Sequence, residues 1–368
     1  MRTFVFTCLL LLGMTTFAQD ANFHIYLCLG QSNMEGNAKV EEQDTVAVDS
    51  RFQVLAAVDC SNLGRTKGNW YKAVPPLARC YTGLTPGDYF GRAMVANLPS
   101  NVRVGIINVA VGGCRIELFD KDNYQSYVET SPDWLKNMVK EYGGNPYARL
   151  VEMAKLAQKD GVIKGILLHQ GESNTNDKDW PLKVKGVYDN LLNDLGLSAA
   201  NVPLLAGEVV HADQNGVCAS MNTMIDSLPQ VIPTAHVISS AGCPAAFDNL
   251  HFTAEGYRML GARYAAKMLS ILGYGDWTSA QNMKLWYNRP AQDWLEALPL
   301  GNSRLGAMVF GGTAREELQL NEETFWAGGP YNNNNPKGLQ VLPEIRRLIF
   351  EGKTLEAQKL IDENYMTP

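Results

Sequence analysis

A serine follows the first apolar segment of this 368-residue chain, at a position where it could act as a nucleophile. Residues 23–29 are mostly apolar and predict a short buried strand, and Gly30 interrupts the pattern just before Ser32. Ligands of an open parallel sheet collect at the carboxyl ends of its strands, so Ser32 would face a substrate. The alternative is an ordinary polar turn, because glycine, serine and asparagine are all frequent turn residues.

A nucleophilic serine needs a general base, and His251 is the strongest candidate. Asp248 lies three residues before it, so its carboxylate can turn back to Nδ1–H of His251 and leave Nε2 free for the proton of Ser32. His211 is the serious rival, since an aspartate lies two residues after it. His169 ends a predicted strand, and we interpret it as a positioning residue.

Ester hydrolysis also needs hydrogen-bond donors for the oxyanion. Gly112 and Gly113 follow one predicted strand and can present a backbone N–H without a side chain in the way, although a plain tight turn would show the same residues. Gln170 follows another predicted strand and can aim its side-chain amide at the same point. Glu172 cannot stabilise an anion, so we expect it either to hold its loop by hydrogen bonds or to be surface charge.

The elements that would position these residues alternate between strands and helices. Five segments predict buried strands: 23–29, 102–109, 162–168, 203–210 and 235–239. Five segments predict helices: 88–98 capped by Asp88, 146–159 capped by Asn145, 182–195, 219–228, and 253–273 capped by Thr253. This alternation indicates an α/β fold with a parallel sheet covered on both faces.

Two further stretches depart from that alternation. Residues 40–87 are rich in Gly, Pro and Asn, which predicts a long irregular loop forming a wall of a binding site. From residue 283 onward, Gly-rich turns and alternating segments predict β structure, with helical patterning at 343–363.

Composition and targeting signals exclude several functional classes. The formal net charge of −6 argues against a nucleic-acid partner. Residues 1–18 are typical of a signal peptide, so we expect an exported protein, periplasmic or secreted. The apolar run of that signal is too short to span a membrane, and no later segment is long enough.

The cysteines and histidines point to disulfides rather than metals. Of the seven cysteines, Cys8 would leave with the signal peptide, and the six that stay could form disulfides in an oxidising compartment. Cys28 lies in the first predicted strand and reads as a small buried hydrophobe. Neither a Cys-x-x-Cys pair nor a His-x-x-x-His pair occurs, so we expect no metal and no cofactor.

Four segments together resemble the signature blocks of the SGNH hydrolases, and more narrowly the sialate O-acetylesterase-like branch, carbohydrate esterase family six. They are 30–34 (Gly-Gln-Ser-Asn-Met), 112–113 (Gly-Gly), 169–173 (His-Gln-Gly-Glu-Ser) and 248–252 (Asp-Asn-Leu-His-Phe). The resemblance covers about residues 22–274. It implies a three-layer α/β/α flavodoxin-like domain, expected over 19–275, that removes O-acetyl groups from sugars without a cofactor.

The resemblance also implies roles for particular residues. Ser32 would be the nucleophile, His251 the base and Asp248 the group that orients the base, with backbone N–H groups of Ser32 and Gly113 as oxyanion donors. The broad superfamily has an asparagine as the third oxyanion donor. This chain has Gln170 at that position, and the narrower branch also has a glutamine there. We therefore expect Gln170 in that role and Asn174 as the alternative. Residues expected to support the site or contact substrate are Glu172, Asn174 and Arg115.

Residues 283–368, after an expected linker at 276–282, resemble the start of glycoside hydrolase family ninety-five, the α-L-fucosidase-like enzymes. Segments 285–287, 294–302, 304–308 and 320–326 carry this resemblance. It implies the truncated start of a β-sandwich domain and the front of a longer two-enzyme protein. We therefore expect an acetylated oligo- or polysaccharide as substrate, and specifically a plant cell-wall glycan. The alternatives are a sialate O-acetylesterase and a catalytically silent carbohydrate-binding protein, and the sequence gives no oligomeric state.

Overall fold

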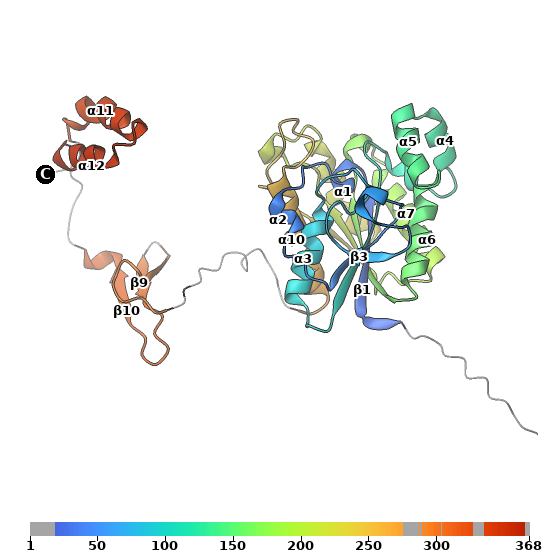
Figure 1. Ribbon diagram of the computed structural model, residues 1–368, viewed down its shortest axis with the longest axis horizontal. Helices are drawn as coiled ribbons and strands as arrows, with labels where there is room; N and C mark the ends of the chain where they lie inside the picture. The colour runs from blue at the N-terminus through green and yellow to red at the C-terminus, as the bar shows by residue number, and fades with distance from the viewer. Residues whose placement is uncertain (1–18, 275–286, 288, 303, 327–334, 365–368) are drawn as a thin grey trace, which may run out of the picture. The chain divides into compact units, whose positions relative to one another are not determined.

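The chain divides into two compact units, Met1–Lys284 and Leu285–Pro368. The computed structural model describes residues 19–274, 287, 289–302, 304–326 and 335–364 (Figure 1). The predicted signal peptide at 1–18 and the predicted linker at 276–282 lie outside the described residues.

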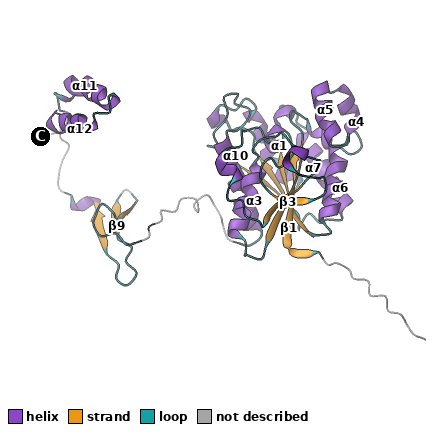
Figure 2. Ribbon diagram, in the orientation of Figure 1, coloured by secondary structure: helices purple, strands orange, loops and turns teal. Residues whose placement is uncertain are grey.

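The first unit is built on a seven-stranded sheet with β1 near its middle (Figure 1, Figure 2). The strand order is β3-β2-β4-β1-β5-β6-β7. The strands are β1 (Asp20–Gly30), β2 (Phe52–Leu55), β3 (Trp70–Lys72), β4 (Arg103–Ala110), β5 (Gly161–His169), β6 (Leu204–Gly207) and β7 (Ala235–Ile238). All five predicted strands are present, and β1 pairs in parallel with both β4 and β5.

The sheet is mixed rather than purely parallel, because β3 runs antiparallel to β2. Both strands come from residues 40–87, so the prediction of a wholly irregular loop there was wrong. A three-residue edge strand such as β3 carries too little alternation to be recognised from the sequence. A disulfide joins Cys60 and Cys80 within this segment. The other cysteines in the described residues are free.

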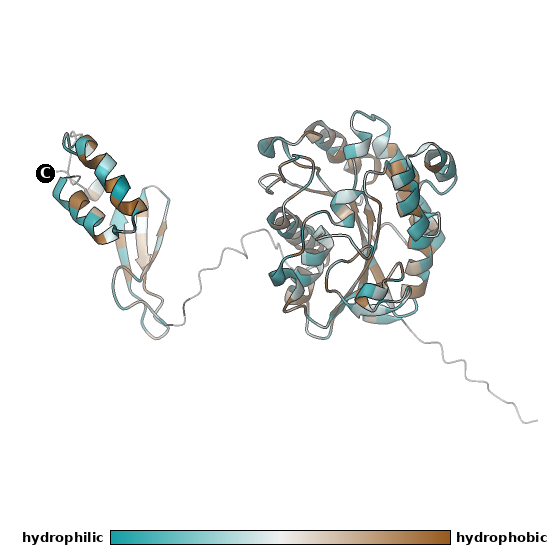
Figure 3. Cartoon of the chain, turned by 45° about the horizontal axis from the view of Figure 1, so that its top comes forward, coloured by the Kyte–Doolittle hydropathy of each residue, from teal (hydrophilic) through white to brown (hydrophobic). Residues whose placement is uncertain are grey.

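Helices cover both faces of the sheet, giving three layers. On one face α3 (Pro86–Asn97) packs against α10 (Ala254–Ile271), and on the other lie α6 (Pro146–Ala157) and α7 (Trp180–Leu195). Successive residues of β1 point to opposite faces, so Tyr26 joins the core under α3 and α10. Figure 3 shows the apolar strands enclosed by helices whose outer faces are hydrophilic.

Local capping chemistry sets where the helices begin. The Asn145 and Thr253 caps are confirmed, since each side chain accepts a backbone N–H of the first turn. The cap predicted at Asp88 was wrong: Thr85 is the cap, and Asp88 is the third helical residue whose carboxylate accepts the N–H of Thr85 at 2.9 Å. The helix predicted at 219–228 is instead broken into short pieces.

The remaining helices of this unit are short. They are α1 (Ser32–Glu35), α2 (Glu42–Thr45), α4 (Tyr124–Thr130), α5 (Asp133–Glu141), α8 (Asn222–Asp226) and α9 (Leu228–Val231). None of the helices in the described residues is long and apolar enough to cross a membrane.

The second unit contains the predicted β structure, and the helical patterning predicted at 343–363 corresponds to two helices. Strands β8 (Leu298–Gly301), β9 (Leu305–Val309) and β10 (Leu318–Glu322) form an antiparallel sheet. Helices α11 (Gly338–Phe350) and α12 (Thr354–Asn364) bury Ile345, Leu348 and Ala357 between them. The sheet leaves several large apolar side chains exposed, among them Leu320 at 77 %.

Asp88 makes the stability of the first unit depend on pH. Burial raises its pKa from 3.8 to about 8, and one carboxyl oxygen has no hydrogen-bond partner. Below pH ~4 both the folded and the unfolded chain hold this proton. Between pH ~4 and ~8 only the unfolded chain releases it, so the free energy of unfolding falls as the pH rises.

We expect Asp88→Asn to remove this dependence, because the amide stays neutral in both states. The free energy of unfolding of the variant should therefore rise relative to wild type, by a few kcal/mol between pH 4 and pH 8. Urea unfolding at pH 5, 6.5 and 8 measures the difference. A constant offset between the two proteins over that range would contradict the argument.

Candidate active site

The nucleophile candidate lies where the central strand ends. Gly30 has φ +148°, and a Cβ there would overlap the carbonyl oxygen of His169 on the neighbouring strand. The next residue, Gln31, donates its N–H to that same carbonyl at 3.1 Å. The chain then turns into α1, which begins at Ser32. Ser32 therefore lies at the carboxyl edge of the sheet.

The structure brings Ser32, His251 and Asp248 into one hydrogen-bonded chain. Oγ of Ser32 lies 2.9 Å from Nε2 of His251, and Nδ1 of His251 lies 2.7 Å from Oδ2 of Asp248. The His251 side chain is 14 % exposed, so the imidazole can reach solvent and substrate. This arrangement lets the serine proton pass to Nε2.

The loop before α10 holds the aspartate in its ionised form. Oδ1 of Asp248 accepts the N–H groups of Leu250 and His251, both at 3.0 Å, while Asn249 turns the chain with φ +51°. Burial opposes ionisation, but these bonds and the bond from His251 together hold the pKa of Asp248 below its usual value. The carboxylate is thus a fixed, charged acceptor for Nδ1–H.

Asn33 connects the serine turn to the histidine loop and had no predicted role. Its side chain is fully buried, and Nδ2 donates to the Leu250 carbonyl at 3.1 Å and to Oε1 of Glu172 at 2.5 Å. Its Oδ1 accepts the hydroxyl proton of Tyr257 on α10 at 2.6 Å. The residue was visible in the sequence directly after Ser32, but nothing in the sequence showed which partners it would meet.

The turn after β4 lies beside the serine. A Cβ at Gly112 would stand 3.8 Å from Cβ of Ser32 and 2.8 Å from Oε2 of Glu35. Glu35 accepts the Gly112 N–H and, at 2.5 Å, a hydrogen bond from Nη2 of Arg79, although burial still raises the pKa of Glu35. Within the described residues no acceptor is bonded to the N–H of Gly113 or of Ser32. Both amides are therefore available to an incoming oxygen.

In this structure the side-chain amide of Gln170, the expected third oxyanion donor, is hydrogen-bonded to other groups. Its Nε2 faces three acceptors: Oε1 of Gln31 at 3.1 Å, the Cys114 carbonyl at 3.3 Å and Oδ1 of Asn174 at 2.7 Å. Its Oε1 accepts the indole N–H of Trp180 at 2.5 Å. An amide nitrogen has only two protons, so Gln170 ties loops together instead.

Asn174, the alternative donor, is also fully engaged. Its Nδ2 donates to Glu117 at 3.0 Å and to Asp177 at 3.1 Å. Nη2 of Arg115 lies 3.4 Å and 3.6 Å from the same two carboxylates, and its side chain is 46 % exposed. Lys183 also contacts both of them. Arg115 thus stands at the rim of the site with its charge already balanced.

Glu172 and His169 form a buried pair beneath the site. Oε2 of Glu172 has no hydrogen-bond partner within the described residues, and burial raises the pKa of Glu172. Burial lowers the pKa of His169 to about 3, so its ring is too weakly basic for the role of general base. His211, the rival base, lies 3.2 Å from Asp213 and has no contact with Ser32.

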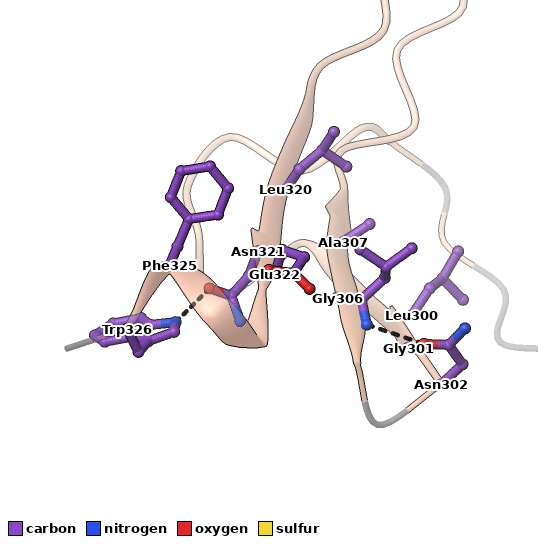
Figure 4. Close-up of a pocket in the computed structure, with 11 residues that line it drawn as sticks. Leu300, Gly301, Asn302, Gly306, Ala307, Leu320, Asn321, Glu322, Phe325 and Trp326 are labelled. Carbon is purple, nitrogen blue, oxygen red and sulfur yellow. Dashed lines mark hydrogen bonds between the residues drawn. The ribbon is translucent and has the colours of Figure 1, made fainter. Parts of the chain in front are cut away.

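A hollow of about 830 Å³ lies on the sheet of the second unit (Figure 4). Leucines from the strands and the exposed rings of Phe325 and Trp326 line it, and the Trp326 indole donates to Asn321 at 2.5 Å. It brings together no nucleophile and base. In the described part of the chain no cluster of His, Cys, Asp and Glu could hold a metal ion.

An α/β fold in which a serine is hydrogen-bonded to a histidine, and that histidine to an aspartate, is typical of serine hydrolases. The profile of the carbohydrate esterase, sialic acid-specific acetylesterase family matches residues 22–270. The chain belongs to this family of carbohydrate esterases. The profile of a glycosyl hydrolase family 65 N-terminal domain matches residues 285–368.

Known relatives match the two units separately. A probable carbohydrate esterase of Arabidopsis thaliana is 25 % identical over 261 residues, which is 67 % of this chain and 90 % of that protein. The crystal structure of an Arabidopsis thaliana protein superposes with a TM-score of 0.52 at 22 % identity, covering 68 % of this chain and 99 % of that one, and shows the same fold.

The second unit matches a different enzyme. Alpha-L-fucosidase 2 of Arabidopsis thaliana is 43 % identical over 75 residues, which is 20 % of this chain and 9 % of that protein. The chain therefore spans less than a tenth of this curated relative.

The position of Gln170 generates a prediction that separates scaffolding from catalysis. Gln170→Ala leaves the buried groups around it unpaired, at a cost of about 1–3 kcal/mol in the free energy of unfolding. We expect both the melting temperature and kcat to fall. A lower kcat with an unchanged melting temperature would instead indicate a direct oxyanion donor.

Proposed function

We propose that this protein is a serine-type carbohydrate O-acetylesterase that hydrolyses acetyl esters on sugars. The hydrogen-bonded chain from Ser32 through His251 to Asp248 carries the proposal. Membership of a carbohydrate esterase family supports the ester bond as the point of attack. A catalytically silent binding protein would have no need to keep these three groups in bonding contact.

The acylation step follows from that geometry. His251 Nε2 takes the hydroxyl proton as Oγ of Ser32 attacks the ester carbonyl, and Asp248 stabilises the imidazolium that forms. The oxyanion of the tetrahedral intermediate is stabilised by the free N–H groups of Ser32 and Gly113. The C–O bond to the sugar then breaks, and His251 returns the proton to the leaving sugar hydroxyl.

Deacylation repeats the same chemistry with water. His251 takes a proton from a water molecule, which attacks the acetyl group on Ser32, and then protonates Oγ as acetate leaves. Because the pKa of Asp248 is held low, the carboxylate stays charged through both steps.

We propose a plant cell-wall polysaccharide as the material on which the enzyme acts. The fucosidase-like second unit supports this, since tethered enzymes gain when one prepares the substrate of the other. Sialic acid esters are the second candidate because the family description names them. The placement of Arg115 against Glu117 and Asp177 weighs against them, because its charge is already balanced before a sialate carboxylate arrives.

We also propose that the protein is exported, through the signal peptide expected at 1–18. The Cys60–Cys80 disulfide supports this, because disulfides persist in oxidising compartments.

Removing any member of the catalytic group should abolish turnover without unfolding the first unit. We expect Ser32→Ala and His251→Ala to lower kcat on p-nitrophenyl acetate by about 10⁴-fold or more, and Asp248→Asn by up to about 10⁴-fold, because the wrong tautomer forms. His211→Ala is the matched control and should keep wild-type activity. Loss of activity in His211→Ala with retention in His251→Ala would mean that the base is misassigned.

A panel of acetylated substrates tests which class of glycan the enzyme prefers. We expect faster acetate release from acetylated xyloglucan, pectin or xylan oligosaccharides than from O-acetyl sialic acid, because Arg115 is not free for a carboxylate. Comparison of kcat/KM across the panel measures this preference. Faster deacetylation of O-acetyl sialic acid would favour the second candidate.

A further inference from the structure

Three exposed aromatic rings belong to segments that adjoin the elements carrying the candidate active site. Phe247 is fully exposed, Tyr81 is 88 % exposed and Trp134 is 51 % exposed. The other strongly exposed aromatic residue in the described part of the first unit is Tyr274, which lies past the end of α10. Single exposed apolar side chains are ordinary, but a group of rings around one site indicates a ligand with apolar faces.

Trp134 lies directly against the turn that supplies the oxyanion donor. Its Cη2 atom is 2.7 Å from the point where a Cβ of Gly113 would stand, and Gly113 itself has φ +69°. Half of the indole nevertheless remains in solvent. The next residue, Leu135, is 1 % exposed, as is Val139 one turn later, so these two side chains anchor α5 in the core. The helix does not need the indole to hold it in place.

The exposed ring of Phe247 belongs to the loop that carries the histidine. It directly precedes Asp248, in a loop closed by the hydrogen bond from the Ala246 N–H to the His251 carbonyl at 2.7 Å. The complete exposure of Phe247 shows that its ring packs on no other part of the described chain.

Tyr81 belongs to a segment that contacts α1 through the residues on either side of it. Two residues later, Gly83 donates its N–H at 2.7 Å to the carbonyl of Gly36, the residue that follows α1. Two residues earlier, Arg79 bonds to Glu35. The segment around Tyr81 is thus fixed against the helix that begins at Ser32.

We propose that Trp134 is a stacking platform for a sugar ring at the scissile ester, with Phe247 and Tyr81 as flanking surfaces for neighbouring sugars. The inference rests on the proposed function and names its substrate class as an acetylated oligosaccharide chain rather than a free monosaccharide. Pyranose rings present C–H groups on their faces, which suit the electron-rich face of an aromatic ring, and keep their hydroxyls at the edge. Nucleobases would also stack, but the net charge of −6 disfavours a phosphate backbone.

The first test compares substrates with and without a sugar. We expect Trp134→Ala to lower the ratio of kcat/KM on acetylated xyloglucan oligosaccharides to kcat/KM on p-nitrophenyl acetate by about tenfold, the equivalent of one lost aromatic contact. Trp134→Phe keeps a ring and should restore most of the ratio. Tyr274→Ala is the matched control, since it removes an exposed ring beyond the far end of α10.

The second test measures binding without turnover. Adding a deacetylated xyloglucan oligosaccharide to the Ser32→Ala protein should change its tryptophan fluorescence, and adding Trp134→Phe to that variant should abolish the change. Because this measurement needs no catalysis, it stands even if the serine mechanism fails.

Two results would overturn the platform. An unchanged substrate ratio in Trp134→Ala would show that the indole does not contact the sugar. An equal fall on both substrates, together with a lower melting temperature, would show that Trp134 only covers Gly113. Full activity of Ser32→Ala would overturn the proposed function instead. The fluorescence measurement would then be the remaining test of whether Trp134 binds a sugar ring.

Discussion

The active site depends on the buried side chain of Asn33, which joins two loops more than two hundred residues apart in the sequence. Its bond to the Leu250 carbonyl fixes the loop that carries His251 and Asp248, and its bond from Tyr257 ties both to the start of α10. Because Asn33 lies next to Ser32 on α1, these contacts set the distance between nucleophile and base. Buried hydrogen bonds of this kind have no water to replace them, so the geometry is held rigidly.

The site is also organised by polar groups that take no part in the proposed chemistry. Glu35, held by Arg79, accepts the Gly112 N–H and so shapes the turn that presents Gly113. Gln170 binds the loops after β1, β4 and β5 together through its three acceptors and through the indole of Trp180. Both side chains are buried, and leaving their partners unpaired would cost more than the bonds themselves contribute. Buried side chains therefore set the positions of the backbone amides that we propose as oxyanion donors.

The two units show opposite balances of buried and exposed apolar surface. The first unit encloses its sheet between helices and keeps most of its large apolar side chains buried. The second unit exposes leucines and aromatic residues across its three-stranded sheet. A sheet buries such a face only when a second layer packs against it. The profile that matches this unit describes a glycosyl hydrolase N-terminal domain.

Much of this protein could be predicted from local sequence patterns. Apolar runs predicted five of the seven strands of the large sheet. Thr253 and Asn145 predicted helix starts, and the Asp-x-x-His spacing predicted a bonded pair, because each signal depends only on neighbouring residues. Only the tertiary structure decided which partners the side chains meet. It determined the hydrogen-bond partners of Gln170, Asn174 and Asn33. It also placed Trp134 against Gly113 and paired Cys60 with Cys80. A side-chain amide or an aromatic ring shows in the sequence what it can bind, but its partner is set by chain crossings that bring distant segments together.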